Sequence, residues 1–223
     1  SRGRPGLTLT AMASAPATQF WRGRGSAEWA RVLPIYWEAG AQPHRTFLVE
    51  ALKALPRFES VRELGCCAGT NLLLIRNAFP HVMAQGMDVS IEAATFAQDK
   101  LVKDGLVSVI CADMLTDAPY WEQHEVDVVI SCYSLAYISP EDLPVLMASI
   151  VRSARIGCVF VEPMMGEPGL IHATTGLTEW RHDYVRLLDT ILASDPRPIN
   201  LESAPLPKPV ELCDGLVRMT FIQ

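Results

Sequence analysis

Five mostly apolar runs of strand length alternate with helical stripes through the middle of the chain. A strand buried on both faces is apolar at nearly every position, whereas a helix packed on a sheet shows apolar residues three or four positions apart. The expected strands are residues 60–64, 82–88, 107–112, 126–131 and 158–162, and the expected helices between them are 71–78, 91–104 and 142–153. This alternation predicts an α/β fold with a doubly wound, parallel sheet.

Further elements are expected on both sides of this region. They are helices at 27–38 and 43–55 before it, and after it a loop at 163–176, a helix with an apolar stripe from Trp180 to Leu192, and strands at 199–204 and 216–222. Pro43 suits the first turn of a helix, where an amide hydrogen would be unbonded. Asp214 and Gly215 are typical of a tight turn, so the last strand is expected to run antiparallel to its neighbours.

The length of 223 residues suits a single hydrophobic core. Residues 1–26 are interpreted as a flexible N-terminal arm, 27–57 as a helical cap and 58–223 as the main domain. The arm is rich in Ala, Ser and Thr and has no acidic residue before Glu28. Its composition therefore also resembles that of a transit peptide.

The composition argues against several classes of protein. Apolar residues make up 49% of the chain and charged residues 20%, which is typical of a folded globular protein and not of a disordered one. The net charge of −6 gives no long-range attraction for a phosphate backbone, which argues against DNA and less firmly against RNA. The most apolar stretches, 126–138 and 156–165, contain Asp127 and Glu162 and are too short to cross a membrane. Six cysteines without a CxxC pair favour a reducing compartment, so a cytoplasmic location is expected.

The segment between the first strand and its helix carries the clearest chemical signal. It reads ELGCCAGTN at residues 63–71, and its small residues let a ligand approach backbone amides that favour a phosphate or a carboxylate. Asp88 ends the second strand, where an acid accepts hydrogen bonds from ribose hydroxyls. Asp113 and Met114 follow the third strand, where they suit the amine and the face of an adenine. Because the carboxyl ends of parallel strands meet at one edge, these residues predict a site for an adenosine-containing ligand.

The run ELGCCAGTN resembles motif I of the class I S-adenosylmethionine-dependent methyltransferases, an acid followed by three glycines at alternate positions. Cys67 stands where the middle glycine is usual. Gly86-Met87-Asp88 resembles the family's ribose-binding segment, residues 112–114 its adenine-contacting segment and residues 127–131 its fourth strand. The resemblance covers about residues 60–163 and is to small, bacterial-type proteins of the family.

This resemblance implies a Rossmann-like sheet of seven strands, mostly parallel with the last strand antiparallel, and helices on both faces. It also implies S-adenosyl-L-methionine as the cofactor. The residues expected to contact the cofactor are Glu63, Gly65, Cys66, Cys67, Ala68, Gly69, Asn71, Asp88, Val89, Asp113, Met114 and Ser131. Glycines at only 65 and 69, without a following Gly-Lys-Ser or Gly-Lys-Thr, argue against a dinucleotide dehydrogenase and a P-loop protein.

The implied activity is methylation of an oxygen or nitrogen on a small-molecule acceptor. The alternatives are an enzyme acting on protein or RNA, and a protein that binds the cofactor without catalysis. His172 and His182 are candidates for a general base, with His172 favoured because it lies in a loop after the fifth strand. Tyr133 is a third catalytic candidate and is expected to line the acceptor pocket with Tyr137. The five histidines show no helical pairing, so no metal is expected, and the oligomeric state stays open between monomer and homodimer.

Overall fold

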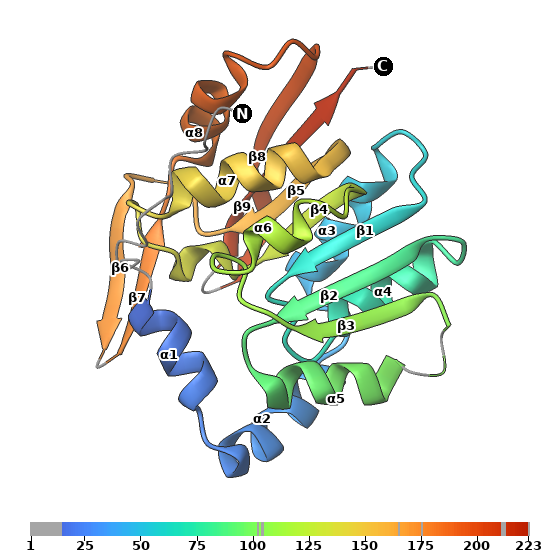
Figure 1. Ribbon diagram of the computed structural model, residues 1–223, viewed down its shortest axis with the longest axis vertical. Helices are drawn as coiled ribbons and strands as arrows, with labels where there is room; N and C mark the ends of the chain where they lie inside the picture. Colours follow the sequence, from blue (N-terminus) through green and yellow to red (C-terminus); the bar gives the residue numbers. More distant parts are fainter. Residues whose placement is uncertain are drawn as a thin grey trace, which may run out of the picture.

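A seven-stranded sheet forms the centre of the computed structural model, which describes residues 15–101, 103, 105–164, 166–174, 176–210 and 213–222 (Figure 1). Its strands are β1 (Ser60–Leu64), β2 (Met83–Asp88), β3 (Val107–Cys111), β4 (Val126–Cys132), β5 (Ala154–Glu162), β8 (Ile199–Val210) and β9 (Cys213–Phe221). Their order across the sheet is β3-β2-β1-β4-β5-β9-β8. Strands β1 to β5 run parallel, and β9 runs antiparallel to both of its neighbours. The expected α/β fold and the antiparallel last strand are confirmed, but Asp214 and Gly215 lie within β9 and not in the expected turn.

Helices cover both faces of this sheet. On one face lie α3 (Pro43–Lys53), α4 (Thr70–Ala78) and α5 (Ile91–Leu101), and on the other lie α6 (Ala118–Trp121), α7 (Leu143–Ser153) and α8 (Tyr184–Leu192). The chain enters the sheet near its middle at β1 and continues outward through β2 to β3. It then returns to β4, which lies on the other side of β1. This reversal creates a crevice at the carboxyl ends of β1 and β4, the usual ligand position in such folds.

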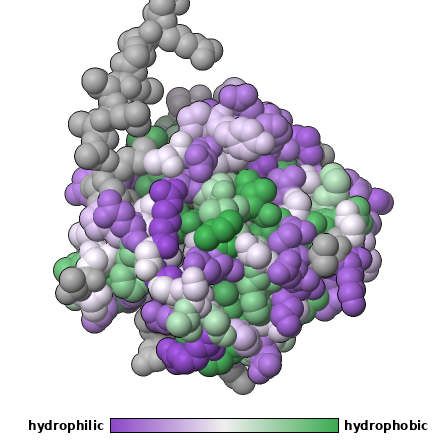
Figure 2. Space-filling model, turned by 60° about the horizontal axis from the view of Figure 1, so that its bottom comes forward, coloured by the Kyte–Doolittle hydropathy of each residue, from purple (hydrophilic) through white to green (hydrophobic). Residues whose placement is uncertain are grey.

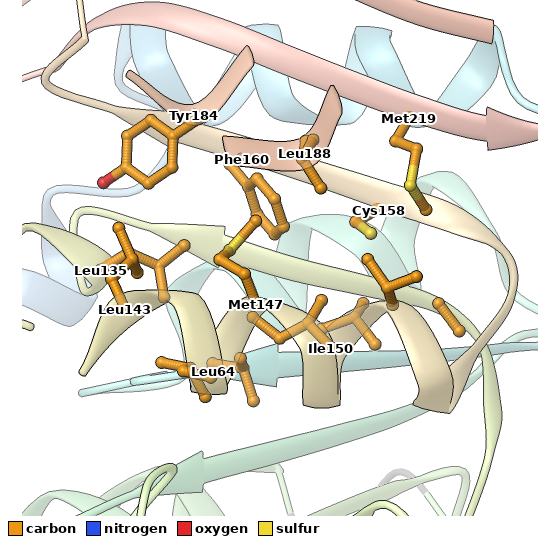
Figure 3. Close-up of a cluster of buried hydrophobic side chains, with 14 of the residues drawn as sticks. Leu64, Leu135, Leu143, Met147, Ile150, Cys158, Phe160, Tyr184, Leu188 and Met219 are labelled. Atoms are coloured by element: carbon orange, nitrogen blue, oxygen red, sulfur yellow. The ribbon is translucent and has the colours of Figure 1, made fainter. Parts of the chain in front are cut away.

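One of the hydrophobic clusters lies between the sheet and the helices α7 and α8. Phe160 of β5 is fully buried, and its ring centroid lies 6.2 Å from that of Tyr184. Figure 3 shows Phe160 next to Met147 of α7 and Leu188 of α8. The continuous apolar character of β4 and β5 is explained by this burial on both faces.

The outer strand β3 is less covered than the other parallel strands. Ile110 is 44% exposed, and Ser108 and Cys111 are exposed as well. When the bottom of Figure 1 is turned forward, apolar residues gather near the centre of the surface, with hydrophilic residues around them (Figure 2). The strands around the crevice, β1 and β4, are by contrast buried almost throughout.

A second, two-stranded sheet corrects the expectation for the segment after β5. The expected loop at 163–176 contains β6 (Gly169–Thr174), which pairs antiparallel with β7 (Leu177–Arg181). Trp180 therefore belongs to a strand and not to the expected helical stripe. Helix α8 begins only at Tyr184, because the Asp183 side chain accepts a hydrogen bond from the Arg186 amide and so caps the helix.

The part of the expected N-terminal arm that the structure describes contains a helix. Helix α1 (Ala15–Gly23) precedes α2 (Ser26–Glu38), and residues 1–14 lie outside the described residues. In Figure 1, α1 lies beside the β6–β7 hairpin, which it contacts through β7. None of the helices in the described part of the chain has the length and apolar character needed to cross a membrane.

Candidate active site

A cavity of about 570 Å³ lies at the carboxyl ends of strands β1 to β4. Helices α1 and α2 and the first turn of α3 cover it, since Trp21, Tyr36 and His44 are among its lining residues. Its volume falls within the range of about 300–1,000 Å³ that is usual for small-molecule sites. The crevice predicted from the order of the strands is therefore a partly covered pocket with room for a ligand.

The loop after β1 is shaped by close contacts that require small residues. Gly65 has a φ of 72°, and a Cβ added there would lie 2.2 Å from Oγ of Ser134. Gly69 has a φ of 78°, and its Cβ would lie 3.0 Å from that of Ala97 on α5. Cys67 also adopts a left-handed conformation, with a φ of 48°. The conformation that glycine favours is thus kept at position 67 even though the residue is cysteine.

Asp88 joins this loop to the end of β2. Its Oδ2 accepts a hydrogen bond from the Cys67 amide and its Oδ1 one from the Ser90 amide, both at 2.9 Å. Burial raises the pKa of Asp88, although these hydrogen bonds act in the opposite direction. Each carboxylate oxygen can accept a second hydrogen bond, so Asp88 has capacity left for two hydroxyl groups of a ligand.

Glu63 and Asn71 form a buried polar pair at the base of the cavity. Asn71 Nδ2 donates to Glu63 Oε1 at 2.6 Å, whereas Glu63 Oε2 and Asn71 Oδ1 are buried without a hydrogen-bond partner among the described residues. Burial raises the pKa of Glu63 to about 8. Two adjacent acceptors without donors are costly in a folded protein and fit a cationic donor such as an ammonium group.

Arg45 and His44 reach the cavity from the start of α3. Arg45 Nη1 donates to the carbonyl of Gly40 at 2.9 Å, and its charge lowers the pKa of Glu63 against the stronger effect of burial. His44 Nδ1 is buried without a partner among the described residues, and burial together with Arg45 lowers the pKa of His44 to about 4. Sequence reasoning did not identify either residue, because neither belongs to a motif that follows a strand.

Asp113 and Met114 line the cavity after β3, as expected. Asp113 is buried, and its Oδ1 accepts from the Leu115 amide at 2.8 Å. Its Oδ2 lies 3.6 Å from Nη2 of Arg22 on α1. The carboxylate thus fixes its own turn and holds α1 over this end of the cavity.

Trp21, Tyr133 and Tyr137 form an aromatic wall of the cavity. The Tyr137 ring centroid lies 5.2 Å from that of Trp21 on α1 and 5.5 Å from that of Tyr133, both in edge-to-face arrangements. Tyr133 follows β4 and has a left-handed φ of 56°. Its hydroxyl donates to Oε2 of Glu179 on β7 at 3.0 Å.

Comparison with known proteins finds a similarity over most of the strands that build this cavity. A family model described as a methyltransferase domain matches residues 61–157, which include β1 to β4 and the glycine loop. Residues 61–157, less than half of the chain, are therefore similar to a methyltransferase domain. No curated protein matches the chain.

Solved structures share the fold of this chain at low sequence identity. Magnesium protoporphyrin IX methyltransferase from Synechocystis PCC 6803, solved with S-adenosylmethionine, is 14% identical with a TM-score of 0.63, and the match covers 96% of this chain and 100% of that one. The N-methyltransferase NodS from Bradyrhizobium japonicum WM9, in complex with S-adenosylhomocysteine, is 18% identical with a TM-score of 0.63, over 88% and 98% of the two chains. The plantazolicin methyltransferase BpumL, in complex with a desmethyl substrate analogue and S-adenosylhomocysteine, is 13% identical with a TM-score of 0.63, over 94% and 96%.

Most of the residues expected to contact the cofactor lie together at the cavity. Lining positions are held by Glu63, Gly65, Cys66, Cys67, Ala68, Asn71, Asp88, Val89, Asp113 and Met114. Gly69 lies behind the loop against α5. The Ser131 side chain also differs from the expectation, because its Oγ donates to the buried Glu162 at 2.7 Å and Ser131 does not line the cavity.

The two histidine candidates for a base lie outside the cavity. His172 is on the exposed face of β6 and is not a lining residue. His182 is buried, and its Nε2 lies 3.0 Å from the carbonyl oxygen of Ile138. Burial lowers the pKa of His182 to about 4, so it is neutral near pH 7. This geometry corrects the expectation for both histidines and leaves Tyr133 as the expected catalytic residue that lines the cavity.

Glu162 is a buried carboxyl that sequence reasoning did not single out as part of the site. It accepts hydrogen bonds from the Ser131 hydroxyl and from the amides of Ser134, Leu135 and Ala136. Burial raises the pKa of Glu162 to about 7. These bonds fix the turn after β4, and with it the position from which Tyr133 enters the cavity. Among the described residues, no three His, Cys, Asp or Glu side chains are grouped as metal ligands.

Proposed function

We propose that this protein transfers the methyl group of S-adenosyl-L-methionine to a small-molecule acceptor at the cavity. The observation that carries the proposal is the pair of unpartnered buried acceptors, Glu63 Oε2 and Asn71 Oδ1, in the same cavity as Asp88 and Asp113. An amino acid joined to adenosine offers a cation for the first pair, hydroxyls for Asp88 and an amine for Asp113. A nucleoside alone or an amino acid alone would not supply a group for each of these three positions.

The residues of the cavity fit this cofactor from end to end. Glu63 and Asn71 would accept from its ammonium group, and Arg45 with the loop amides would bind its carboxylate. Asp88 would accept from the ribose hydroxyls, while Met114 packs on the adenine. When bound, the cofactor supplies a methyl group on a positively charged sulfur, which is already activated for transfer.

The protein's own contribution is alignment and exclusion of water. The α1 helix covers the cavity through Trp21 and through the approach of Arg22 to Asp113. Orientation of two reactants in a closed site can account for a large share of the rate enhancement of a direct displacement. Tyr133 and Tyr137 are the residues of the aromatic wall that we assign to the acceptor.

A small acceptor is supported by the size and enclosure of the cavity. Its volume of about 570 Å³ must hold both the cofactor and the acceptor. The similar structures include enzymes named for a porphyrin and for the natural product plantazolicin. The net charge of −6 supports the proposal that DNA is not a substrate.

The cysteines support a cytoplasmic location for this activity. Cys66, Cys67, Cys111, Cys132 and Cys158 are free thiols. Free cysteines of this number are typical of a reducing compartment, where disulfides do not persist.

Calorimetric titration with S-adenosylhomocysteine tests the cofactor site directly. We expect Asp88→Ala to weaken binding about ten- to a hundredfold, because charge-assisted hydrogen bonds to the ribose are lost. Asp88→Asn separates the loss of charge from the loss of the hydrogen bonds to the loop. Asp99→Ala is the matched control, since Asp99 is an exposed acid on α5. Unchanged affinity in a folded Asp88→Ala protein would contradict the proposed site.

A further inference from the structure

A chain of hydrogen-bonding groups leads from the acceptor wall of the cavity to the β6–β7 hairpin. The Tyr133 hydroxyl donates to Glu179 Oε2 at 3.0 Å, and Tyr137 is joined to Tyr133 by a side-chain hydrogen bond. Tyr133 and Tyr137 line the cavity, whereas Glu179 is half-buried on β7 and does not line it. These hydrogen bonds therefore connect the cavity with a half-buried carboxylate that does not line it.

We propose that the acceptor is a phenolic hydroxyl compound, that Tyr133 removes its proton, and that Glu179 receives the proton of Tyr133. This inference rests on the proposed function and adds the acceptor class and the route of the proton. Tyr133 is the catalytic residue, because it contacts the acceptor. Glu179 acts through Tyr133 and is a positioning residue that also holds the transferred proton.

The geometry of Tyr133 suits this role. Its left-handed φ of 56° is uncommon for a bulky residue, and it is held by the turn whose amides bind Glu162. A phenolic oxygen donates one hydrogen bond and accepts up to two. Tyr133 donates to Glu179 and can accept from both Tyr137 and an acceptor hydroxyl.

The walls of this end of the cavity favour a flat aromatic acceptor. Trp21 and Tyr137 meet edge to face at 5.2 Å, and Tyr133 and Tyr137 at 5.5 Å, so their rings present surfaces against which another ring can pack. A phenol has a pKa of about 10 and is mostly protonated near neutral pH, so its methylation gains from a base. A neutral amine needs no base before transfer, and the tyrosine-to-carboxylate chain would then have no chemical role.

The step balances in atoms and charge. The acceptor proton moves to the Tyr133 oxygen as the Tyr133 proton moves to Glu179 Oε2. The electron pair left on the acceptor oxygen forms the new bond to the methyl carbon, while the carbon–sulfur bond breaks and its electron pair stays on sulfur. The products are the methyl ether, the neutral thioether and a protonated Glu179, which loses its proton to solvent.

The charged and titratable groups around Glu179 come from three elements. Tyr133 and Tyr137 face Glu179 from the turn after β4, and their side chains are hydrogen-bonded to each other. His172 on β6 lies opposite Glu179 in the pairing of the hairpin. Arg181 is two residues along β7 and lies 3.4 Å from Asp214. A pH profile of the reaction therefore has to be compared between variants and not assigned from the wild-type curve alone.

Three probes distinguish a proton route from a structural role, namely phenol, 4-nitrophenol and aniline. At about pH 8, phenol is protonated and 4-nitrophenol is ionised, so only phenol needs a base. We expect phenol to be methylated faster than aniline, and Glu179→Gln to lower kcat for phenol about 10- to 100-fold with KM within about twofold. The same variant should change kcat for 4-nitrophenol by less than about threefold, and Tyr133→Phe should show the same selective loss.

Controls and contrary outcomes follow from the same assay. Glu179→Asp should recover part of the phenol rate, and Glu167→Gln, an exposed acid just before the hairpin, should leave both rates unchanged. Equal losses with phenol and 4-nitrophenol in Glu179→Gln would show a structural role and overturn the inference. Turnover of aniline alone, or of neither phenol by a protein that binds S-adenosylhomocysteine, would overturn the acceptor class. Absence of S-adenosylhomocysteine binding in the wild type would instead overturn the proposed function.

Discussion

Glu63 is a buried carboxyl group whose ionisation is costly until a cation binds. Its folded-state pKa of about 8 lies above the ordinary value of 4.5, so the folded protein binds the proton more tightly than the unfolded chain does. The resulting stabilisation is fully present below about pH 4.5 and is lost as the pH rises through about 8. Glu162 adds an effect of the same sign, since burial raises its pKa to about 7.

Glu63→Gln should therefore change stability in a pH-dependent way. At about pH 8.5 we expect the cofactor-free variant to melt about 2–4 °C above the wild type, because the amide carries no charge to bury. At about pH 4.5 the difference should vanish, since Glu63 is then protonated in the folded wild type. Thermal unfolding at the two pH values measures this, with Glu59→Gln as an exposed control. An equal shift at both values would show that ionisation of Glu63 is not the cause.

Substitution of Cys67 tests whether a cysteine at the position of the usual middle glycine affects cofactor binding. The contact with Asp88 is made by the Cys67 amide, and the side chain packs beside the cluster around Trp29. Cys67→Gly should keep the amide contact and suit the left-handed φ, while it loses some packing and gains unfolded-state entropy. We expect affinity for S-adenosylhomocysteine within about threefold of the wild type by calorimetry. A much tighter-binding glycine variant would mean that the thiol obstructs the cofactor.

The residues that sequence reasoning found are those that directly follow a strand. Glu63, Asp88 and Asp113 end neighbouring parallel strands, so the fold class alone brings them together. Arg45 and Glu179 act at the same site from a cap helix and a hairpin, and nothing in their local sequence reports this position. Such residues become recognisable only when the long-range packing is known.

At the scale of elements, β5 is the strand on which the two halves of the sheet depend. It pairs with β4 on one side and with β9 on the other. A Cβ at Gly157 would lie 2.0 Å from the backbone oxygen of Met219, which cannot move without breaking the β5–β9 pairing. The absence of a side chain at Gly157 is thus a condition for docking the last strand.

Gly157→Ala should be strongly destabilising. We expect a loss of at least about 3 kcal/mol, or about 6–12 °C in melting temperature, because the clash is with backbone and not with a flexible side chain. Gly105→Ala is the matched control, since nothing lies within 4 Å of a Cβ there. Chemical denaturation of both variants measures the difference. Similar stability of the two proteins would contradict the close β5–β9 approach.

The elements that were misjudged share a physical cause. Trp180 falls at helical spacing with Tyr184 and Leu188, yet residues 177–181 pair with β6, and the cap at Asp183 delays the helix. Helix α1 lies within a stretch that reads as an arm, and its observed packing partners, Tyr137 and Asp113, come from distant segments. The strands β1, β4 and β5 were predictable because they are buried on both faces at nearly every position.

At the scale of the whole molecule, the cavity joins parts that are far apart in the sequence. The caps α1 and α2, the start of α3 and the ends of β1 to β4 all contribute lining residues. A ligand that binds across these parts binds the folded protein and not the unfolded chain. Binding must therefore raise the stability of the whole domain by an amount set by concentration and affinity.

S-adenosylhomocysteine should stabilise the entire protein in one cooperative transition. At a concentration about a hundred times its Kd the expected gain is about 2.7 kcal/mol, which corresponds to about 5–11 °C for a chain of this size. Asp88→Ala should show a smaller shift at the same concentration, because its affinity is lower. NAD should produce no shift in melting temperature, because the loop after β1 has glycines only at positions 65 and 69. In addition, Arg45, Glu63 and Asn71 offer binding groups for an amino acid and not for a second nucleotide. Differential scanning calorimetry measures these shifts, and stabilisation by NAD equal to that by S-adenosylhomocysteine would point to a dinucleotide site instead.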